Sequence, residues 1–384
     1  MHFNEQQNNI INSMKKYVIL AAAAALVMTA CVKTNVTSSV NENVNDGMKA
    51  IGFANYTPKA VTKAAAGNYV SGTTLVENAQ FAVYAWNYAN DESFDSSAAP
   101  GFMAPAVVTW KGDVEDGDAN TYSPLRYWPA GDTPDKLAFI AYYPANGAGI
   151  TAAAGLGAYK FTAQATDSEM VDFLVADLVP DQVYGGTNAS PTYPGTVKFT
   201  FKHQLTRVGF KFKKTDVPAT ITITSAKLVN IKTTGTLTVS YADAATTTVW
   251  SDQATEEGKV FTVNNPGVLT TTAAPATVED ENLFLMVPQD MVAKPETDDD
   301  PAAQYLEIEW TVESGAGDKV TNKKKLYLAE VLEADAEDAD PAKINWTKNM
   351  SVTYTITIGP KPIWFTATVG DWDTPETTGY FVEG

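Results

Sequence analysis

Residues 196–214, TVKFTFKHQLTRVGFKFKK, carry the clearest strand pattern in the chain. Apolar residues alternate along the first half, where one face is formed by Val197, Phe199, Phe201, His203 and Leu205. After Thr206-Arg207 the phase slips by one residue, and the apolar positions become Val208, Phe210 and Phe212. Alternation with a period of two is typical of a strand with one buried face, and a slip of one residue exchanges the two faces. The stretch therefore predicts a bulge or corner at which the chain bends between two sheets.

Short apolar segments of the same kind lie on both sides of this stretch. They cover residues 81–86, 137–143, 172–176, 221–223, 237–239, 283–287, 305–312, 325–328, 352–358 and 363–369. Turn-forming residues separate them, and Ser314–Asp318 predicts a hairpin between the seventh and eighth. No strong helical pattern occurs beyond the N-terminal region. We predict an all-β protein built from antiparallel sandwiches, with one domain at 68–195 and a second at 196–384.

The N-terminal region has the pattern of an export signal. Lys15-Lys16 precedes the uncharged segment 17–30, which ends at Cys31, the only cysteine. At about 1.5 Å per residue this segment is shorter than a hydrocarbon core of roughly 30 Å, so we predict a cleaved signal over residues 1–30. Residues 27–31, VMTAC, resemble a bacterial lipobox, which implies cleavage before Cys31 and acylation of its thiol and new amine. An ordinary signal peptide with an incidental cysteine is the alternative. Residues 31–67 are predicted to contain a tether and a first strand near 48–53, and this whole segment is a candidate propeptide.

Charge and composition exclude several classes of partner and chemistry. The net charge of −18 argues against nucleic acid or anionic lipid as a partner, because both require clustered Lys and Arg. Of the two histidines, His2 lies in the signal region, and His203 alone cannot form a His-rich zinc site or a paired-imidazole mechanism. His203 is in phase with its apolar neighbours and is predicted to be a packed, hydrogen-bonded strand residue. The sequence lacks a G-x-S-x-G motif, a complete dinucleotide fingerprint and a P-loop. We therefore predict no enzymatic activity, no cofactor and no metal.

Three alternatives remain open from the residues alone. The number of carboxylates in the chain does not exclude a glycosidase, because its catalytic pair is recognised by the distance between two carboxyl groups in the folded protein. Residues 113–118, DVEDGD, are similar to an oxygen-rich calcium loop but lack the glycine and glutamate of an EF-hand, so a solvated loop is favoured. Four aromatic residues, Trp86, Trp110, Tyr127 and Trp128, offer either a platform for sugar stacking or part of the core, and the core is favoured.

Taken together, the segments resemble the fimbrillin-like family of Bacteroidales lipoproteins, the subunits of type V pili. The resemblance is carried by Cys31 and by segments 51–53, 81–85, 127–129, 139–144, 172–176, 199–208 and 363–372. It covers nearly the whole mature chain. It implies two transthyretin-like β-sandwich domains, export to the outer surface of the outer membrane, and a structural role in adhesion.

The resemblance also implies assembly by strand exchange. Family members are clipped after the first strand, and a strand of the next subunit fills the groove that the clipped strand leaves. The donor would come from Ile363, Phe365, Ala367 and Val369. The family's shaft subunits are typically cut after arginine, but the first arginine here is Arg126. The expected cut is therefore Lys63-Ala64, with Lys59-Ala60 as the alternative. An uncut chain would suit an anchor subunit, and the competing function is a monomeric surface lipoprotein that binds a glycan or a host protein.

Overall fold

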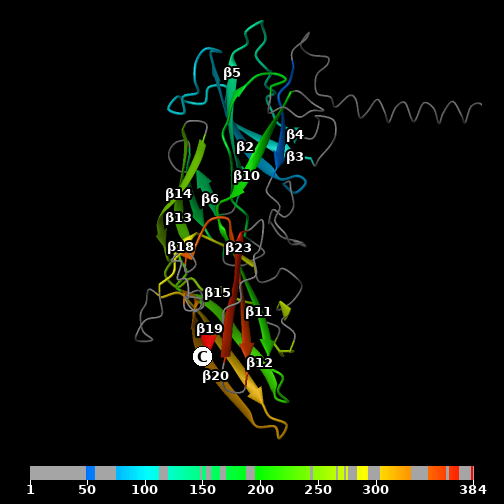
Figure 1. Cartoon of the computed structure of the whole chain (residues 1–384), viewed down its shortest axis with the longest axis vertical. Coiled ribbons are helices and arrows are strands. Elements are labelled where there is room, and N and C mark those ends of the chain that lie inside the picture. Colours follow the sequence, from blue (N-terminus) through cyan, green and yellow to red (C-terminus); the bar gives the residue numbers. More distant parts are fainter. Residues whose placement is uncertain are drawn as a thin grey trace, which may run out of the picture.

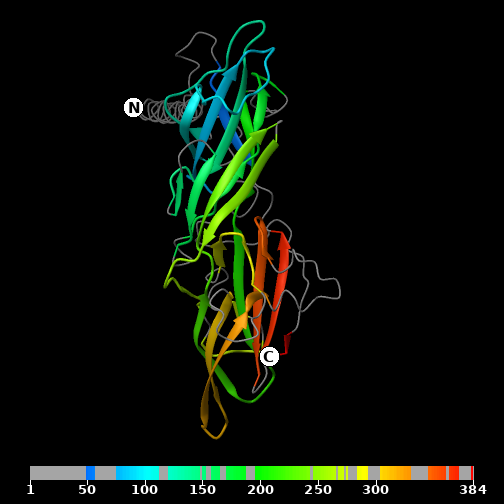
Figure 2. The ribbon, with the colours of Figure 1, turned by 90° about the vertical axis from the view of Figure 1, so that its left-hand side faces the viewer.

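The protein is an elongated stack of β-sheets (Figures 1 and 2). The computed structural model describes residues 49–56, 75–111, 120–147, 149–152, 157–164, 170–186, 195–242, 245–264, 267–271, 274–275, 283–292, 303–329, 345–359, 363–371 and 382–383. The predicted all-β class is confirmed, because nearly every regular element in these ranges is a strand.

The largest sheet forms one end of the molecule, the upper end in Figure 1. Its strands, in spatial order, are β1 (Gly52–Tyr56), β10 (Thr196–His203), β8 (Leu174–Ala176), β5 (Lys136–Tyr143), β2 (Gln80–Tyr88), β3 (Met103–Trp110) and β4 (Asn120–Thr121), and β9 (Val179–Gln182) also pairs with β5. All neighbours in this sheet are antiparallel except β1 and β10, which are parallel.

Two further sheets form the opposite end. The first contains β16 (Ala274–Pro275), β11 (Thr206–Lys214), β22 (Met350–Ile358), β23 (Ile363–Asp371) and β24 (Val382–Glu383), with β17 (Leu283–Met286) also paired to β11. The second contains β15 (Phe261–Thr262), β12 (Thr220–Val229), β19 (Tyr305–Glu313) and β20 (Lys319–Tyr327). The predicted hairpin is confirmed: β19 and β20 pair along their full length, and the Gly317 amide donates to the Ser314 carbonyl across the turn. Gly317 has a φ of 88°, which favours glycine at this position.

The predicted corner lies between β10 and β11. Gln204 and Leu205 separate these strands, which belong to different sheets. Val197, Phe199 and Phe201 of β10 pack in the core of the large sheet, whereas Val208, Phe210 and Phe212 of β11 pack in a second core. The slip of phase in the sequence therefore marks the point at which the chain passes from one core to the other.

A fourth sheet lies beside the large one and joins segments far apart in the chain. Its order is β14 (Ala245–Ala254), β13 (Thr234–Ala242), β7 (Ala158–Thr162) and β6 (Ile150–Ala152). A short pair, β18 (Gln289–Asp290) with β21 (Asn345–Trp346), completes the fold. Strand β13 pairs with β7, and β10 lies in the large sheet. Strands that follow residue 195 therefore share sheets with strands that precede it. The division into transthyretin-like domains at 68–195 and 196–384 stays a prediction.

Two hydrophobic clusters follow from these pairings. Strand β2 shows the reason: Phe81, Val83 and Ala85 lie in one cluster, and Ala82 and Trp86 lie in the other. The first cluster is enclosed by the large sheet, and the second runs from its outer face into the opposite end of the molecule. The expected alternation in β2 is thus confirmed, because both faces of the strand meet a core.

Candidate assembly site

Strand β1 and the residues just before it occupy a slot between two backbones. On one side β1 pairs with β10 in parallel register, from Gly52 opposite Thr196 to Tyr56 opposite Thr200. On the other side the Ile51 amide donates to the Arg126 carbonyl at 2.9 Å, and the Trp128 amide donates to the Lys49 carbonyl at 2.9 Å. The Tyr122 hydroxyl also donates to the Ile51 carbonyl at 2.9 Å. The first strand begins four residues later than the sequence predicts, at Gly52 instead of residue 48.

The side chains of this segment close the core of the large sheet. Ile51 and Phe53 are each 2% exposed. The Phe53 ring stacks on Phe199 at a centroid distance of 5.7 Å and lies 5.4 Å from Tyr122. Burying an apolar side chain of this size contributes about 1.5–3 kcal/mol, so these two residues are the principal apolar contribution of the segment. Trp128 anchors the opposite wall by donating from its indole nitrogen to the Gly195 carbonyl at 3.1 Å.

The predicted processing residues lie outside the described ranges. These are Cys31, Lys59, Ala60, Lys63 and Ala64, together with the signal at 1–30. Arg126, the first arginine, is described: its carbonyl holds Ile51, and its guanidinium lies 6.0 Å from the Phe102 ring centroid. Arg126 is therefore part of the slot around β1.

The predicted donor segment forms β23. Its backbone pairs with β22 in antiparallel register, from Ile363 opposite Ile358 to Asp371 opposite Met350. On its other side only Trp364 and Phe365 pair with β24. The strand predicted at 363–369 is confirmed, although it is not the last one because β24 follows it. Most of its outer edge carries no partner strand in the described part of the chain.

His203 is buried against an acidic partner that the sequence did not single out. Its Nδ1 lies 2.8 Å from Oδ2 of Asp172, and the two side chains are 1% and 0% exposed. The prediction of a packed, hydrogen-bonded His203 is confirmed. Burial, and secondarily the carboxylate of Asp172, raises the pKa of the nearby Tyr143 to about 12. Asp172 begins the predicted segment 172–176, but nothing in that segment links it to His203, and the pairing of β8 with β10 brings the two residues together.

The other candidates give no second site among the described residues. Trp86, Trp110 and Trp128 are between 2% and 5% exposed, which confirms the predicted core role for these three residues and leaves no platform of tryptophans for sugar stacking. Tyr127, the fourth predicted residue, is only partly buried. The acidic run 113–118 lies outside the described ranges. Within those ranges, no three His, Cys, Asp or Glu side chains gather closely enough to hold a metal ion. The same part of the chain contains no helix with the length and apolar character needed to cross a membrane.

Comparison with known proteins gives one family and several solved structures. The model of a family described as fimbrillin-like matches residues 62–372. No protein of curated function matches the chain. A proposed cell adhesion protein from Bacteroides uniformis ATCC 8492 is 16% identical, with 86% of this chain and 100% of that chain covered and a TM-score of 0.47. A second from Bacteroides ovatus ATCC 8483 is 16% identical, with 86% and 100% covered and a TM-score of 0.42. The C-terminally truncated tip fimbrial protein Mfa3 from Porphyromonas gingivalis is 10% identical, with 77% and 95% covered and a TM-score of 0.37.

Proposed function

This chain belongs to the fimbrillin-like family, and on that premise we propose that it is a structural subunit of a type V pilus. The subunit is exported as a lipoprotein acylated at Cys31, reaches the outer surface of the outer membrane, and joins other subunits by strand exchange. Its role is adhesion, and it catalyses no reaction. The alternative, a monomeric binder of a glycan or host protein, loses the tryptophan platform that it would have used, since those tryptophans are buried.

The seating of β1 is the observation that carries this proposal. Among the described strands, β1 pairs with β10 alone, and the predicted cut at Lys63-Ala64 follows it in the sequence. Removing it would free the edge of β10 and uncover Phe199, Tyr122 and the neighbouring apolar side chains. An unpaired strand edge beside apolar pockets is the arrangement that accepts an added strand.

Strand β23 supplies the complementary element. It pairs along its full length with β22 and meets β24 at only two positions, so releasing it requires the separation of one long strand ladder. A strand given by one subunit and received by the next makes a head-to-tail contact that does not close, and such a contact builds a filament.

The first experiment determines the native N-terminus. Intact mass and N-terminal sequencing are measured on protein released from the surface of its own cells. A start at Ala64 is expected and identifies a processed, polymerising subunit. A lipidated start at Cys31 would overturn processing and favour an anchor or a monomer.

The second experiment tests strand exchange directly. A chain that starts after Cys31 is treated with a lysine-specific protease, and heat-sensitive oligomer ladders are followed by gel electrophoresis. We expect ladders from the cut chain and none from a matched Lys59→Gln/Lys63→Gln variant. A cut chain that lacks residues 363–384 should accept a donor but extend no further. Monomers from the cut, full-length chain would contradict the proposal.

A further inference from the structure

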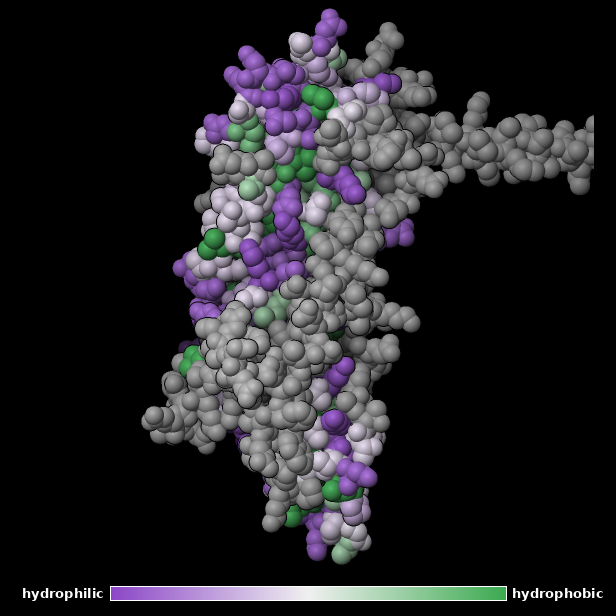
Figure 3. All heavy atoms as spheres, in the orientation of Figure 1, coloured by the Kyte–Doolittle hydropathy of each residue, from purple (hydrophilic) through white to green (hydrophobic). Residues whose placement is uncertain are grey.

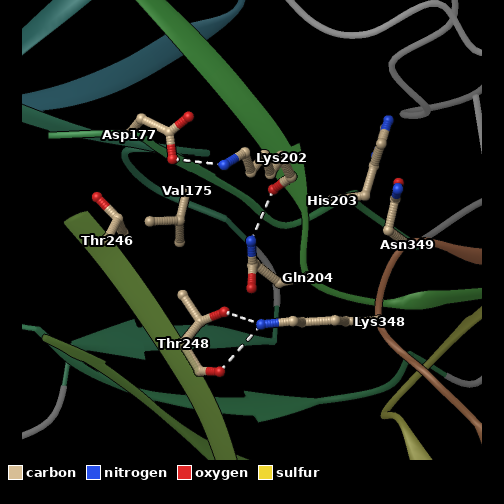
Figure 4. A pocket seen from close by; sticks show the side chains of 9 residues that line it. All are labelled: Val175, Asp177, Lys202, His203, Gln204, Thr246, Thr248, Lys348 and Asn349. Carbon is tan, nitrogen blue, oxygen red and sulfur yellow. Dashed lines mark hydrogen bonds and ion pairs between the residues drawn. The ribbon is translucent and has the colours of Figure 1, made fainter.

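A polar cleft lies where β10 turns toward β11, away from the slot that holds β1. Its volume is about 380 Å³. The lining comes from β8, β10, β14 and the turn between β21 and β22, and Figure 4 shows the side chains: Val175, Asp177, Lys202, His203, Gln204, Thr246, Thr248, Lys348 and Asn349. Figure 3 shows a mostly hydrophilic described surface in this view, with scattered single hydrophobic residues.

Lys348 brings a positive charge into this cleft without an acidic partner in the described part of the chain. Its Nζ donates to the backbone oxygen of Thr248 at 3.0 Å and to Oγ1 of the same residue at 2.6 Å. Burial, and then the neighbouring Lys202 ammonium, lowers the pKa of Lys348 below its usual range. Lys202 is itself paired with Asp177 at 2.7 Å, so the two lysines and one aspartate leave a net charge of +1. A single anionic group therefore complements the cleft.

Gln204 supplies a buried acceptor at the centre of the same cleft. The residue is 3% exposed, and its Nε2 donates to the Lys202 carbonyl at 2.8 Å. The Oε1 atom has no hydrogen-bond partner within the described ranges, and Figure 4 shows it turned toward Thr248 and Lys348. An unpaired buried amide oxygen costs about 1–3 kcal/mol, so a hydroxyl donor from a ligand would be favourable here.

The shape and hydrogen bonding select among anionic ligands. A cavity of this size is at the lower end of the range for small-molecule sites, which suits one or two sugar rings. An extended peptide would need the free edge of β14, but the carbonyl of Thr248 on that strand is already occupied by Lys348. A carboxylated sugar offers both the anion for Lys348 and the hydroxyl donors for Gln204 and the threonines.

We infer that this cleft binds a carboxylated monosaccharide unit, a uronic acid or a sialic acid, with the carboxylate at Lys348 and a hydroxyl at Gln204 Oε1. The inference does not depend on strand exchange, because every residue involved lies outside β1 and β23. It gives the subunit a recognition site of its own for acidic glycans.

The test is a ligand-observed NMR titration of the uncut chain that starts after Cys31. Glucuronic acid and N-acetylneuraminic acid are the two probes and identify the source, with glucose as the neutral control and triglutamate as the peptide control. We expect at least one acidic sugar to bind with a Kd near or below about 1 mM, at least about tenfold tighter than glucose. Raising the ionic strength should weaken this binding.

Three variants locate the site. Lys348→Gln removes the charge but retains a donor for Thr248, and it should weaken binding about tenfold or more. Asp177→Asn removes the competing carboxylate and should strengthen binding. Lys319→Gln, an exposed lysine at the start of β20, is the matched control and should change nothing.

Unchanged thermal unfolding checks that each variant is folded. Equal binding of glucose, tighter binding of triglutamate, no acidic-sugar binding at millimolar concentration, or equal affinity in Lys348→Gln and Lys319→Gln would each overturn the inference.

Discussion

Two strand pairs in the described part of the chain are parallel, β1 with β10 and β22 with β11, but their strands are held very differently. β1 contributes five paired positions and lies at the edge of its sheet. β22 contributes eight paired positions to β11 and is covered on its other side by β23. On the core face β1 and the residue before it bury Ile51 and Phe53, whereas β22 buries Val352, Tyr354, Ile356 and Ile358 at 0% exposure.

β1 therefore completes a core that other strands form, whereas β22 is one of the strands that form the other core. Loss of β1 removes two large side chains and one ladder, and the remaining strands of the large sheet keep their own partners. Loss of β22 would detach β23 and uncover the aromatic cluster around Phe210. Local opening free energies within one protein span a wide range, and we expect β1 to open first.

Raising the pH should lower the stability of both strand pairs, and this is the largest effect that we expect. Burial raises the pKa of Tyr143, in the core beside β1, to about 12, and burial also raises the pKa of Tyr354 in β22. Both phenols stay protonated in the folded state while the unfolded chain titrates near 10.0. Their stabilisation is therefore fully present below pH 10 and is lost as the pH rises through the folded pKa of Tyr143.

Circular dichroism and tyrosinate absorbance during an alkaline titration measure this effect. We expect the sheet signal to disappear between pH 10 and about 12, together with delayed phenol ionisation. Complete phenol ionisation near pH 10 with an unchanged sheet signal would contradict it.

Substitution of Phe210 tests the pair that is covered on both sides. Phe210 is 2% exposed and stacks on Tyr354 at a centroid distance of 5.6 Å. Phe210→Ala should lower the free energy of unfolding by about 3–5 kcal/mol in urea titrations. The exposed neighbour Lys211→Ala is the control on the same strand and should have little effect.

Phe53→Ala tests the edge pair and should cost less globally. Phe53→Ala removes the same ring as Phe210→Ala does. The decrease in the free energy of unfolding cannot, however, exceed the free energy that holds β1 in place, because β1 can separate while the remainder of the protein stays folded. Hydrogen exchange should become faster at Ile51, Gly52 and the β10 amides that pair with β1. A cooperative loss as large as that of Phe210→Ala would show that β1 is as integral as β22.

Removal of single hydroxyl groups gives the smallest and most closely matched effects. The Trp346 indole donates to the Tyr354 hydroxyl at 3.0 Å, and the Tyr122 hydroxyl donates to the Ile51 carbonyl at 2.9 Å. Tyr354→Phe leaves a buried indole N–H unpaired and should cost about 1–3 kcal/mol of global stability. Tyr122→Phe should cost about 0.5–1.5 kcal/mol, detected as faster exchange around β1 with a nearly unchanged urea midpoint.

The local sequence pattern predicted those strands whose own residues alternate between apolar and polar or form an apolar run. The alternation in β10, the apolar run of β5 and the Thr-alternating β22 were all visible, because one face of each strand meets a core. The strand β14 was not predicted, since ATTTVWSDQA has few apolar residues and the strand is half exposed. The strand β6, Ile150–Ala152, was not predicted either, since it lies in a Gly/Ala-rich segment and forms because β7 provides a partner.

The residues of the candidate sites likewise include some that the sequence predicted and others that only the structure revealed. His203 was predicted to be packed from its own strand, but its partner Asp172 and the slot residues Tyr122 and Trp128 came from the three-dimensional structure. The residues of the cleft have no common motif, because they come from segments as distant as Val175 and Asn349.

By itself, the sequence determined the all-β class, the corner between β10 and β11, the β19–β20 hairpin and the strand β23. Each of these depends on side-chain alternation or turn chemistry within a few residues. Only the tertiary structure decided that β1 lies parallel to β10, that β22 lies parallel to β11, and that β13 reaches back to β7. Strand partners are chosen by which apolar faces cover one another across long loops, and local alternation is the same for every candidate partner.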